Sequence, residues 1–543
     1  MDQPFVTDVA ARPYWSDRLV ALADAYRKAI FAIILLLYLL GFNGQWRPEP
    51  DAGLYLSIGR NIAQGQGYTY HGEPHHLAYP GLPWLWAGVF KVAPAQAIFV
   101  DHVIILLTGL ACLALCYRLF LLFAGRPMAV FMTLGLAVSR MFYRYCYELR
   151  SDMPFLLGVL AFLCGFEAIA RGPAGVVVPR DDATPTSRAR WYDWALMAGG
   201  LALAVVMRPT MWALVGAAVI ASLRLLYVRR PRWTLVGVVA LVALAVAVVR
   251  FGPSRDHGNA PFSQYEQALL DVARHRTGEF LNRIWTENIP NLFEPAASEA
   301  MFGLDMGLGL NTLGSILAIG IGLSLFRYRF IWGLFYLFTV LMMVLVLPLD
   351  RYFLPVLPLV VYGWWRLLVW IERHLPRRWG TVVFLTLFLV GSGTNVVKIA
   401  RFIFDQHQRP FLETFRGGRF AHYPAIGDAL KANLPPDAWI VTAPRLERIL
   451  TFYSQRNVTG AGTMGAADLQ LLADVDRAYV LNPHDEPVGK WLSDTPLKVG
   501  PAAIMIGDPA TNGWSLHPLL GKNSTRERMP VAPATSPTGG PTP

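Results

Sequence analysis

Long apolar runs, repeated along most of the chain, restrict what this sequence can fold into. They occupy residues 31–42, 97–124, 234–249, 310–326 and 381–390. The hydrocarbon core of a bilayer requires a helix of about 17–25 apolar residues, and a soluble domain has no use for so many such runs. Only 16% of the residues are charged and 54% are hydrophobic. The sequence therefore predicts an α-helical polytopic membrane protein.

The apolar runs, with shorter stretches between them, predict about eleven membrane-spanning helices. We place them near residues 28–43, 96–122, 127–146, 153–170, 192–207, 209–228, 233–251, 307–326, 330–348, 352–371 and 379–398. Every second connection, beginning with residues 1–27, is rich in Arg. Because cytoplasmic loops carry such an excess, the N-terminus is predicted to be cytoplasmic. The first run has no cleavage pattern after it, so we expect a multi-pass protein of the cell membrane without a signal peptide.

Four polar segments then share the non-cytoplasmic face, namely residues 44–95, 147–152, 252–306 and everything after 398. Since they emerge on one side, we expect them to build a common site. Apolar residues recur at helical spacing within 51–95 and over 263–288. These patterns predict helices in the membrane interface, attached to a transmembrane domain of residues 28–398.

The composition changes after residue 398, where the apolar runs end. Residues 423–443 predict a helix, a Pro-Pro turn and a strand, and residues 474–481 predict a further strand. A small extracytoplasmic α/β domain is therefore expected over 399–523. The Pro- and Thr-rich tail, residues 524–543, is predicted to be disordered.

Two carboxylates, Asp51 and Asp152, lie at the boundaries of predicted spans on the non-cytoplasmic face. A carboxylate beside the membrane is costly and often functional. A structural interpretation also exists, because Asp51 lies where an N-cap belongs and Asp152 begins a helix with Pro154 in its first turn. Capping by Asp contributes about 0.5–2 kcal/mol. Finding both on one face favours a shared functional site.

Histidines and arginines add candidate ligands. His71, His75 and His76 form a cluster whose spacing matches no zinc site. They could bind an anionic head group or an acceptor, or simply lie on the surface. Arg351 can bind a phosphate in bidentate fashion or extend to the interface, whereas for Arg208, next to a proline, we favour the interfacial interpretation.

The remaining composition limits cofactors and partners. The net charge is +11, but the basic residues lie in connections between predicted spans, so no nucleic-acid partner is predicted. The cysteines lie in or at the edges of apolar runs, without the further ligands that a metal set needs. We predict no cofactor, although a divalent cation is left open. The cysteines are Cys112, Cys116, Cys146 and Cys164.

Four motifs, in this order and on this face, resemble a known superfamily. They are Asp51 after the first span, an interfacial helix followed by Tyr79-Pro80, Asp152 before Met-Pro, and Arg351 in Arg-Tyr-Phe-Leu-Pro. Over roughly residues 28–400 the chain resembles the GT-C polyprenyl-phosphate-sugar glycosyltransferases. The nearest branches are protein O-mannosyltransferases, aminoarabinose transferases of lipid A and galacturonosyl transferases, that is, families 39 and 83.

The resemblance implies roles for these residues. Asp51 and Asp152 match the catalytic acidic residues of the first two outer loops. Arg351 matches the Arg of a late Arg-Tyr motif. Two departures are Ala52, where a Glu usually follows the Asp, and Ala78-Tyr79, where Glu-Lys is frequent. The residues expected to bind donor phosphate or substrate are Arg351, His75, His76, Tyr79 and Glu148.

The resemblance implies an inverting hexosyl- or pentosyltransferase of the cell envelope. Its partners would be membrane lipid, a polyprenyl-phosphate-linked sugar and an acceptor that is a protein, a lipid or a polysaccharide. Asp51 would be the general base, and a nearby Asp152 would raise the pKa of one carboxyl. The alternatives are a transporter or lipid flippase, and a non-catalytic assembly factor, in which Asp51 and Asp152 would lie far apart.

Overall fold

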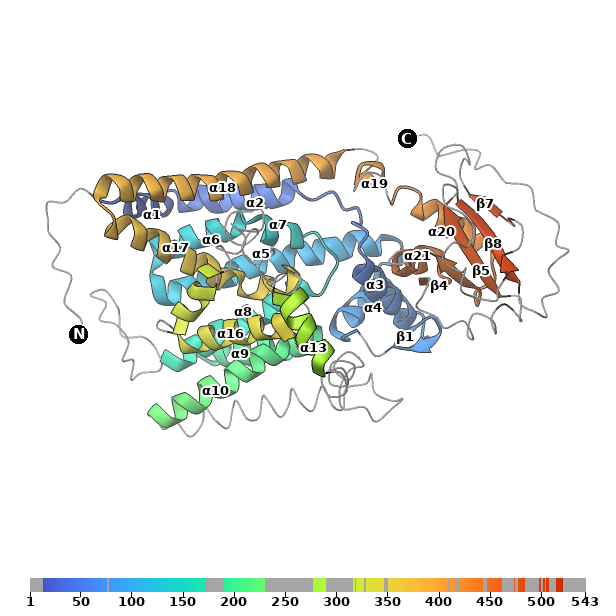
Figure 1. Cartoon of the computed structure of the whole chain (residues 1–543), viewed down its shortest axis with the longest axis horizontal. Helices are drawn as coiled ribbons and strands as arrows, with labels where there is room; N and C mark the ends of the chain where they lie inside the picture. Colours follow the sequence, from blue (N-terminus) through green and yellow to red (C-terminus); the bar gives the residue numbers. More distant parts are fainter. Residues whose placement is uncertain are drawn as a thin grey trace.

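The described helices form an elongated bundle with a smaller, sheet-containing unit at one end (Figure 1). The computed structural model describes residues 13–75, 78–171, 190–229, 277–289, 316–317, 319–326, 329–345, 350–408, 411–415, 420–442, 447–460, 473, 477–483, 498–499, 502, 504–506 and 514–520. The predicted span 233–251 and the tail 524–543 lie outside these residues.

Most predicted spans correspond to helices of the bundle. Four described stretches are long and apolar enough to cross a membrane, namely Pro94–Leu122, Asp152–Ala170, Leu354–His374 and Arg377–His407. Shorter apolar helices pack with them, and the total of about eleven spans stays a prediction. The bundle helices are α2 (Arg27–Leu40), α5 (Ala97–Ala124), α6 (Arg126–Ala137), α7 (Arg140–Tyr145), α8 (Asp152–Arg171), α9 (Trp191–Met207), α10 (Met211–Arg229), α16 (Phe330–Leu345), α17 (Leu357–His374) and α18 (Arg377–His407).

The prediction of one continuous helix over 127–146 is wrong, because the chain breaks between α6 and α7. Tertiary partners satisfy the backbone groups that the break releases. The Tyr38 hydroxyl donates to the carbonyl of Ala137 at 2.9 Å, and the Arg140 amide donates to Oδ1 of Asn395 at 3.1 Å. A break inside an apolar region is tolerated where neighbouring helices supply such partners.

Small residues allow two of the helices to pack closely. A Cβ added to Gly158 of α8 would lie 2.8 Å from the backbone of Gly200 on α9. Backbones that approach this closely gain dispersion contacts that larger side chains would prevent. Asp152 lies at the first turn of α8, one of these two closely packed helices.

The N-terminal segment contains a helix that the sequence analysis did not anticipate, α1 (Trp15–Ala25). The buried carboxylate of Glu372 on α17 accepts from the amides of Trp15 and Ser16, at 2.9 and 3.2 Å. Free amides at a helix start are satisfied by such an acceptor. This contact joins the N-terminal segment to the end of the bundle opposite the C-terminal unit (Figure 1).

The first polar segment contains the two helices predicted within 51–95, α3 (Pro50–Ala63) and α4 (Gly81–Val92). Pro50 stands at the first turn of α3, where its fixed φ suits a helix start. A hairpin between α3 and α4 pairs β1 (Thr69–Tyr70) with β2 (Glu73–Pro74). Its two turn residues, His71 and Gly72, have φ of 57° and 76°, which a two-residue hairpin turn favours.

Part of the helix predicted over 263–288 lies outside the described residues. The described part is helical, as α13 (Thr277–Arg283) and η3 (Ile284–Asn288).

The C-terminal unit is a mixed α/β structure, as the sequence predicts. A helix, α20 (Tyr423–Asn433), is followed by β3 (Trp439–Thr442), and β5 (Ala478–Pro483) is the second predicted strand. The strand order is β4-β3-β5-β8-β6, with β7 beside β8, and β3 is parallel to both of its neighbours. The other elements are α21 (Glu447–Ser454), β4 (Asn457–Gly460), β6 (Lys498–Val499), β7 (Ile504–Ile506) and β8 (Trp514–Leu520).

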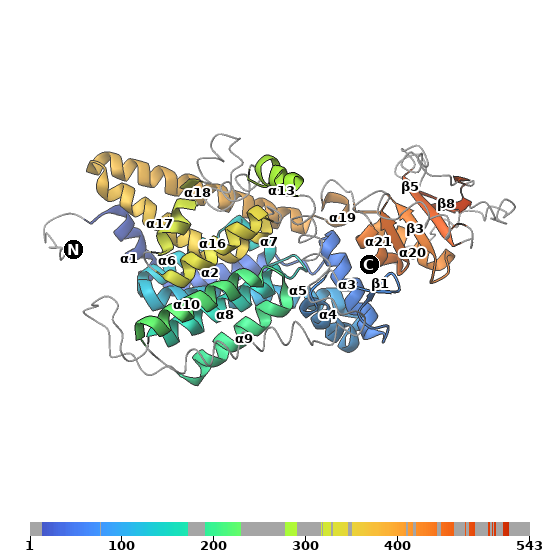
Figure 2. The same cartoon turned by 60° about the horizontal axis from the view of Figure 1, so that its bottom comes forward.

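The boundary between bundle and C-terminal unit differs from the predicted one. Helix α18 continues past residue 398 to His407, and α19 (Phe411–Thr414) follows it. Both views place α3, α4 and the hairpin beside the C-terminal unit, at the end of the bundle opposite α1 (Figures 1 and 2). This arrangement agrees with the expectation that residues 44–95, 147–152 and the chain after 398 share one face.

Candidate functional site

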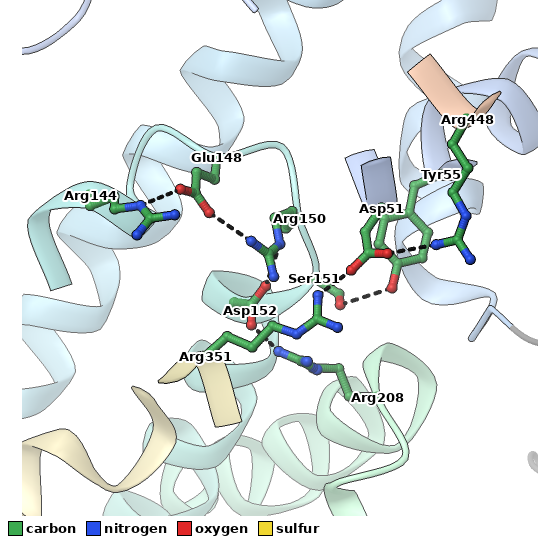
Figure 3. Close-up of polar contacts among 10 residues, drawn as sticks. All are labelled: Asp51, Tyr55, Arg144, Glu148, Arg150, Ser151, Asp152, Arg208, Arg351 and Arg448. Carbon is green, nitrogen blue, oxygen red and sulfur yellow. Dashed lines mark hydrogen bonds and ion pairs between the residues drawn. The ribbon is translucent and has the colours of Figure 1, made fainter. Parts of the chain in front are cut away.

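Charged side chains from five parts of the chain meet at the end of the bundle that faces the C-terminal unit (Figure 3). We call them the arginine–carboxylate network. Five guanidinium groups face three carboxylates, an excess of two positive charges. The members are Asp51, Glu148, Asp152, Arg144, Arg150, Arg208, Arg351 and Arg448.

Asp51 lies in the first turn of α3 and pairs with two arginines. Its Oδ2 accepts from Arg351 in η5 (Asp350–Tyr352), and its Oδ1 accepts from Arg448 of α21 at 2.7 Å. The interpretation of Asp51 as a helix cap is wrong, because the N-cap of α3 is Glu49. Arginine supplies the partners that such a cap would have found in the backbone.

Asp152 lies at the start of α8 and is nearly fully buried. Arg208, between α9 and α10, donates to its Oδ1, and Arg150 lies 3.3 Å from its Oδ2. Arg208 is therefore an ion-pair partner inside the protein. The interpretation of Arg208 as an interfacial side chain is wrong, since the carboxylate of Asp152 draws it inward.

Glu148 extends the network away from Asp51. It accepts from Arg144 at 2.6 Å and from Arg150 at 3.0 Å. Arg150 thus bridges Glu148 and Asp152, which lie two residues to either side of it in the sequence. This Glu-x-Arg-x-Asp run folds into an alternating chain of charges, in which every buried ion has a partner.

Neutral side chains join the two halves of the network. The Tyr55 hydroxyl on α3 lies 3.5 Å from Oγ of Ser151, next to Asp152 (Figure 3). The guanidinium groups of Arg208 and Arg351 lie over the ring of Tyr352, with their central carbons 4.8 and 5.3 Å from the ring centroid. Asp51 and Asp152 therefore share one environment, contrary to what the assembly-factor hypothesis predicts.

The surrounding arginines decide the protonation state of the carboxylates. Burial by itself would raise the pKa of Asp51, but the charges of Arg351, Arg150 and Arg448 outweigh it and hold that pKa well below 3.8. Burial likewise opposes ionisation of Glu148, yet Arg144 and Arg150 lower its pKa. The expectation that two nearby carboxyls raise the pKa of one is therefore wrong for Asp51, because arginines stand between them.

The described residues do not fit a divalent cation. Among the residues that the structure describes, no group of three His, Cys, Asp or Glu side chains is placed to hold a metal ion. The oxygens of Asp51, Glu148 and Asp152 already accept from guanidinium groups. A metal ion in the network would be repelled by five arginines.

The hairpin that contains His71 and His75 lies next to α21, because His71 contacts Thr451 at 3.2 Å. The ring of His75 packs within the hairpin, 5.7 Å from that of Tyr70 and 6.4 Å from that of Tyr68. Tyr79 is half-buried just before α4, and His76 lies outside the described residues. Roles for His75, His76 and Tyr79 in substrate binding stay predictions.

Ala52, which stands where the second acid was expected, and its neighbour Gly53 lie at a tightly packed part of α3. Ala52 is fully buried, and a Cβ added to Gly53 would lie 2.6 Å from the carbonyl oxygen of Arg448. Helix α21 thus rests directly on the backbone of α3. A glutamate at position 52 would begin from a backbone position that is fully buried.

Sequence reasoning did not name three of the five arginines around these carboxylates, Arg144, Arg150 and Arg448, and it assigned a fourth, Arg208, to the membrane interface. Arg144 and Arg150 flank Glu148 in sequence, and Arg208 is the charged residue of the short connection between α9 and α10. Their positions in the sequence, close to predicted site residues or to the end of a predicted span, could have identified these three arginines as candidates. Arg448 offered no such signal, because it lies 397 residues from Asp51 and in another unit of the fold.

The described architecture matches solved structures over most of the chain. ArnT from Cupriavidus metallidurans in the apo state aligns with a TM-score of 0.53 and 15% identity, covering 94% of this chain and 100% of that one. The same protein bound to undecaprenyl phosphate aligns at 0.51 and 14%, covering 93% and 99%. This chain has the GT-C fold.

A second kind of GT-C structure is also similar. The Archaeoglobus fulgidus oligosaccharyltransferase, tethered to an acceptor peptide, aligns with a TM-score of 0.53 and 11% identity, covering 87% of this chain and 70% of that one. At these identities the likeness concerns the fold. No protein-family model and no curated protein matches the sequence.

Proposed function

We propose that this chain is a membrane glycosyltransferase that moves a sugar from a polyprenyl-phosphate donor to an envelope acceptor on the non-cytoplasmic face. The observation that carries the proposal is the pairing of Asp51 with Arg351 inside a network with excess positive charge. Such a site offers a base to a hydroxyl and cations to a phosphate, side by side. These are the two groups that a polyprenyl-phosphate glycosyl transfer must accommodate.

The electrostatics of the network favour a phosphate leaving group. The phosphodiester of a polyprenyl-phosphate sugar carries one negative charge, and the phosphate that departs carries more. Five guanidinium groups, held around three carboxylates in a largely buried site, would therefore stabilise the departing group more than the bound donor. Pre-oriented charges aimed at developing charge are typically the largest single contribution to catalysis. The GT-C structure that contains undecaprenyl phosphate supports this class of donor.

The reaction follows from this arrangement. An acceptor hydroxyl attacks the anomeric carbon as the bond from that carbon to the phosphate oxygen breaks. The electron pair leaves with the phosphate, and Asp51 takes the hydroxyl proton. A single displacement with one base inverts the anomeric carbon. Asp152, held by Arg150 and Arg208, keeps both arginines in place around the phosphate.

Asp51 is a weak base while both of its oxygens are paired, as its lowered pKa indicates. A donor phosphate competes for Arg351, because guanidinium binds phosphate and carboxylate in the same bidentate manner. Binding of the donor would thus free one oxygen of Asp51 for the acceptor proton. The base becomes available only when a donor is present, which limits unproductive contact with water.

The test is sugar transfer from a polyprenyl-linked donor by the protein in membranes. We expect Asp51→Asn to lower the rate by about 10²–10⁴-fold, the usual contribution of a general base. Asp437→Asn is the matched control, because Asp437 also pairs with an arginine, Arg477, but is exposed in the C-terminal unit.

Full activity of Asp51→Asn at normal expression would contradict the catalytic assignment. Counterflow of a lipid-linked sugar in proteoliposomes, without any transfer, would instead support the transporter or flippase.

A further inference from the structure

The two oxygens of Asp51 are held by arginines from different units of the fold. Arg351 belongs to the bundle and contacts Oδ2, whereas Arg448 belongs to the C-terminal unit and contacts Oδ1 at 2.7 Å. Each oxygen has one guanidinium partner (Figure 3). A carboxylate held in this way can lose one partner and keep its position through the other.

Contacts independent of Asp51 fix the place of Arg448. Arg60 of α3 donates to the carbonyl of Phe452 at 2.6 Å, and its guanidinium lies over the Phe452 ring at 4.4 Å. The hairpin adds a contact of 3.2 Å between His71 and Thr451. Because α21 is docked at several points, the backbone of Arg448 is held beside Asp51 whether or not the two side chains pair.

The surroundings of the two arginines differ. Arg351 lies over Tyr352, whose ring also carries Arg208, and the charge of Asp152 acts on it as well. It therefore lies near Arg208 and Arg150, where several guanidinium groups could bind an incoming phosphate. Arg448 lies on the opposite side of Asp51, with 34% of its side chain exposed. A phosphate bound among Arg150, Arg208 and Arg351 would leave Arg448 on Asp51.

We propose that Arg448 is a positioning residue, which holds Oδ1 of Asp51 throughout the reaction while the donor phosphate takes Arg351 from Oδ2. The inference rests on the proposed function and gives the two arginines different roles: Arg448 orients Asp51, and Arg351 binds the phosphate. It also makes the C-terminal unit a working part of the site, because this unit supplies the contact that orients the base. A base misplaced by about 1 Å loses about 100-fold in rate.

The experiment compares Arg448→Gln and Arg448→Lys in the full chain, with kcat, the donor KM and the pH profile of kcat/KM as readouts. For Arg448→Gln we expect kcat to fall about 10–100-fold, since the base loses its orientation. The donor KM should stay within about threefold, because the phosphate is bound elsewhere. The lysine variant keeps the charge without the planar fork, so it should recover part of kcat.

The pH profile separates an electrostatic role from a structural one. The charged groups that face Asp51 are Arg351 of η5, Arg150 before α8 and Arg448 of α21, and the Tyr55 hydroxyl also acts on it from α3. In the wild type the acid limb from Asp51 is expected below about pH 4, because arginines lower the pKa of this carboxyl. Removing Arg448 takes away one cation, so the acid limb of kcat/KM should move to higher pH, toward that of an ordinary carboxyl. In Arg448→Lys it should move back toward the wild-type position.

Arg60→Gln is the matched control, because it removes another arginine contact between α3 and α21 without touching Asp51. It should leave the acid limb in place. The inference is overturned by unchanged kcat in Arg448→Gln, by a rise in donor KM alone, or by an equal pH shift in Arg60→Gln. If the wild type transfers no sugar, the proposed function fails and takes the inference with it; an active wild type with unaffected Arg448→Gln overturns the inference alone.

Discussion

Asp51 and Asp152 each contact two arginines, yet they differ in exposure and in the origin of their partners. The side chain of Asp51 is 25% exposed, and that of Asp152 is 3% exposed. The partners of Asp51 lie 300 and 397 residues away, whereas Arg208 lies 56 residues from Asp152 and Arg150 is almost adjacent to it. One carboxylate joins two units of the fold at an accessible surface, and the other is sealed within the bundle.

This difference in exposure suggests a catalytic role for Asp51 and a structural role for Asp152. A carboxylate that receives a proton from a substrate must be reachable, which favours Asp51 as the base. A buried ion pair is strongly destabilised when one partner is removed, by about 3–5 kcal/mol, whereas exposed pairs contribute about 0–1 kcal/mol. Asp152 is therefore expected to dominate the stability of the network, and Asp51 its activity.

The largest effect on stability is expected for Asp152→Asn, which leaves Arg150 and Arg208 buried with too little negative charge. We expect the free energy of unfolding to fall by about 3–5 kcal/mol, and by a smaller amount for Asp51→Asn, whose side chain is 25% exposed. Thermal unfolding in detergent measures both. Asp193→Asn, which breaks the pair between the buried Asp193 and the partly exposed Arg118 elsewhere in the bundle, should also lower stability but keep the activity of the folded protein. Equal destabilisation by the Asp51 and Asp152 variants would erase the distinction.

A somewhat smaller effect, on activity, is expected for Arg351→Gln. Removing one pre-oriented donor to a developing anion lowers kcat by about 10²–10³-fold. Because Arg351 is also proposed to bind the donor phosphate, the donor KM should rise as well, unlike that of Arg448→Gln. Steady-state kinetics with a polyprenyl-phosphate sugar give both constants. A variant with unchanged donor KM would remove Arg351 from the phosphate site.

The pH dependence should distinguish a paired carboxylate from a base with a raised pKa. The arginines hold the pKa of Asp51 below 3.8. A carboxylate with a lowered pKa contributes stability that is present above its unfolded value of about 4 and is lost as the pH falls through the folded value. We therefore expect stability from this network to decline only below about pH 4, and kcat/KM to show no acid limb from Asp51 between about pH 5 and 8. An acid limb near neutral pH that disappears in Asp51→Asn would contradict the pairing.

The smallest effect is expected for Tyr55→Phe, which removes the hydroxyl that links α3 to Ser151. At 3.5 Å this is a long contact, so its loss should cost about 0.5–1 kcal/mol. Thermal unfolding would register it as a small shift, with Ser151→Ala giving a shift of similar size. A loss of activity much greater than this would mean that Tyr55 contacts the substrate.

The sequence determined the membrane character of the chain and the helix boundaries of α5, α8 and α9 to within a few residues. It also identified Asp51, Asp152 and Arg351 as candidate site residues. Apolar length and helical or alternating periodicity are local properties, so they can be read without a structure. The positions of acidic residues relative to predicted spans were enough to place two carboxylates on one face.

Tertiary structure decided how these carboxylates are used. The break between α6 and α7 depends on Tyr38 and Asn395, and the state of Asp51 depends on Arg351 and Arg448, all remote in sequence. A carboxylate alone in an amphipathic helix looks like a cap; with two guanidinium partners it is an ionised group held in place. Coulombic interactions act over a few ångströms in space, whatever the separation along the chain, and only folding sets those distances.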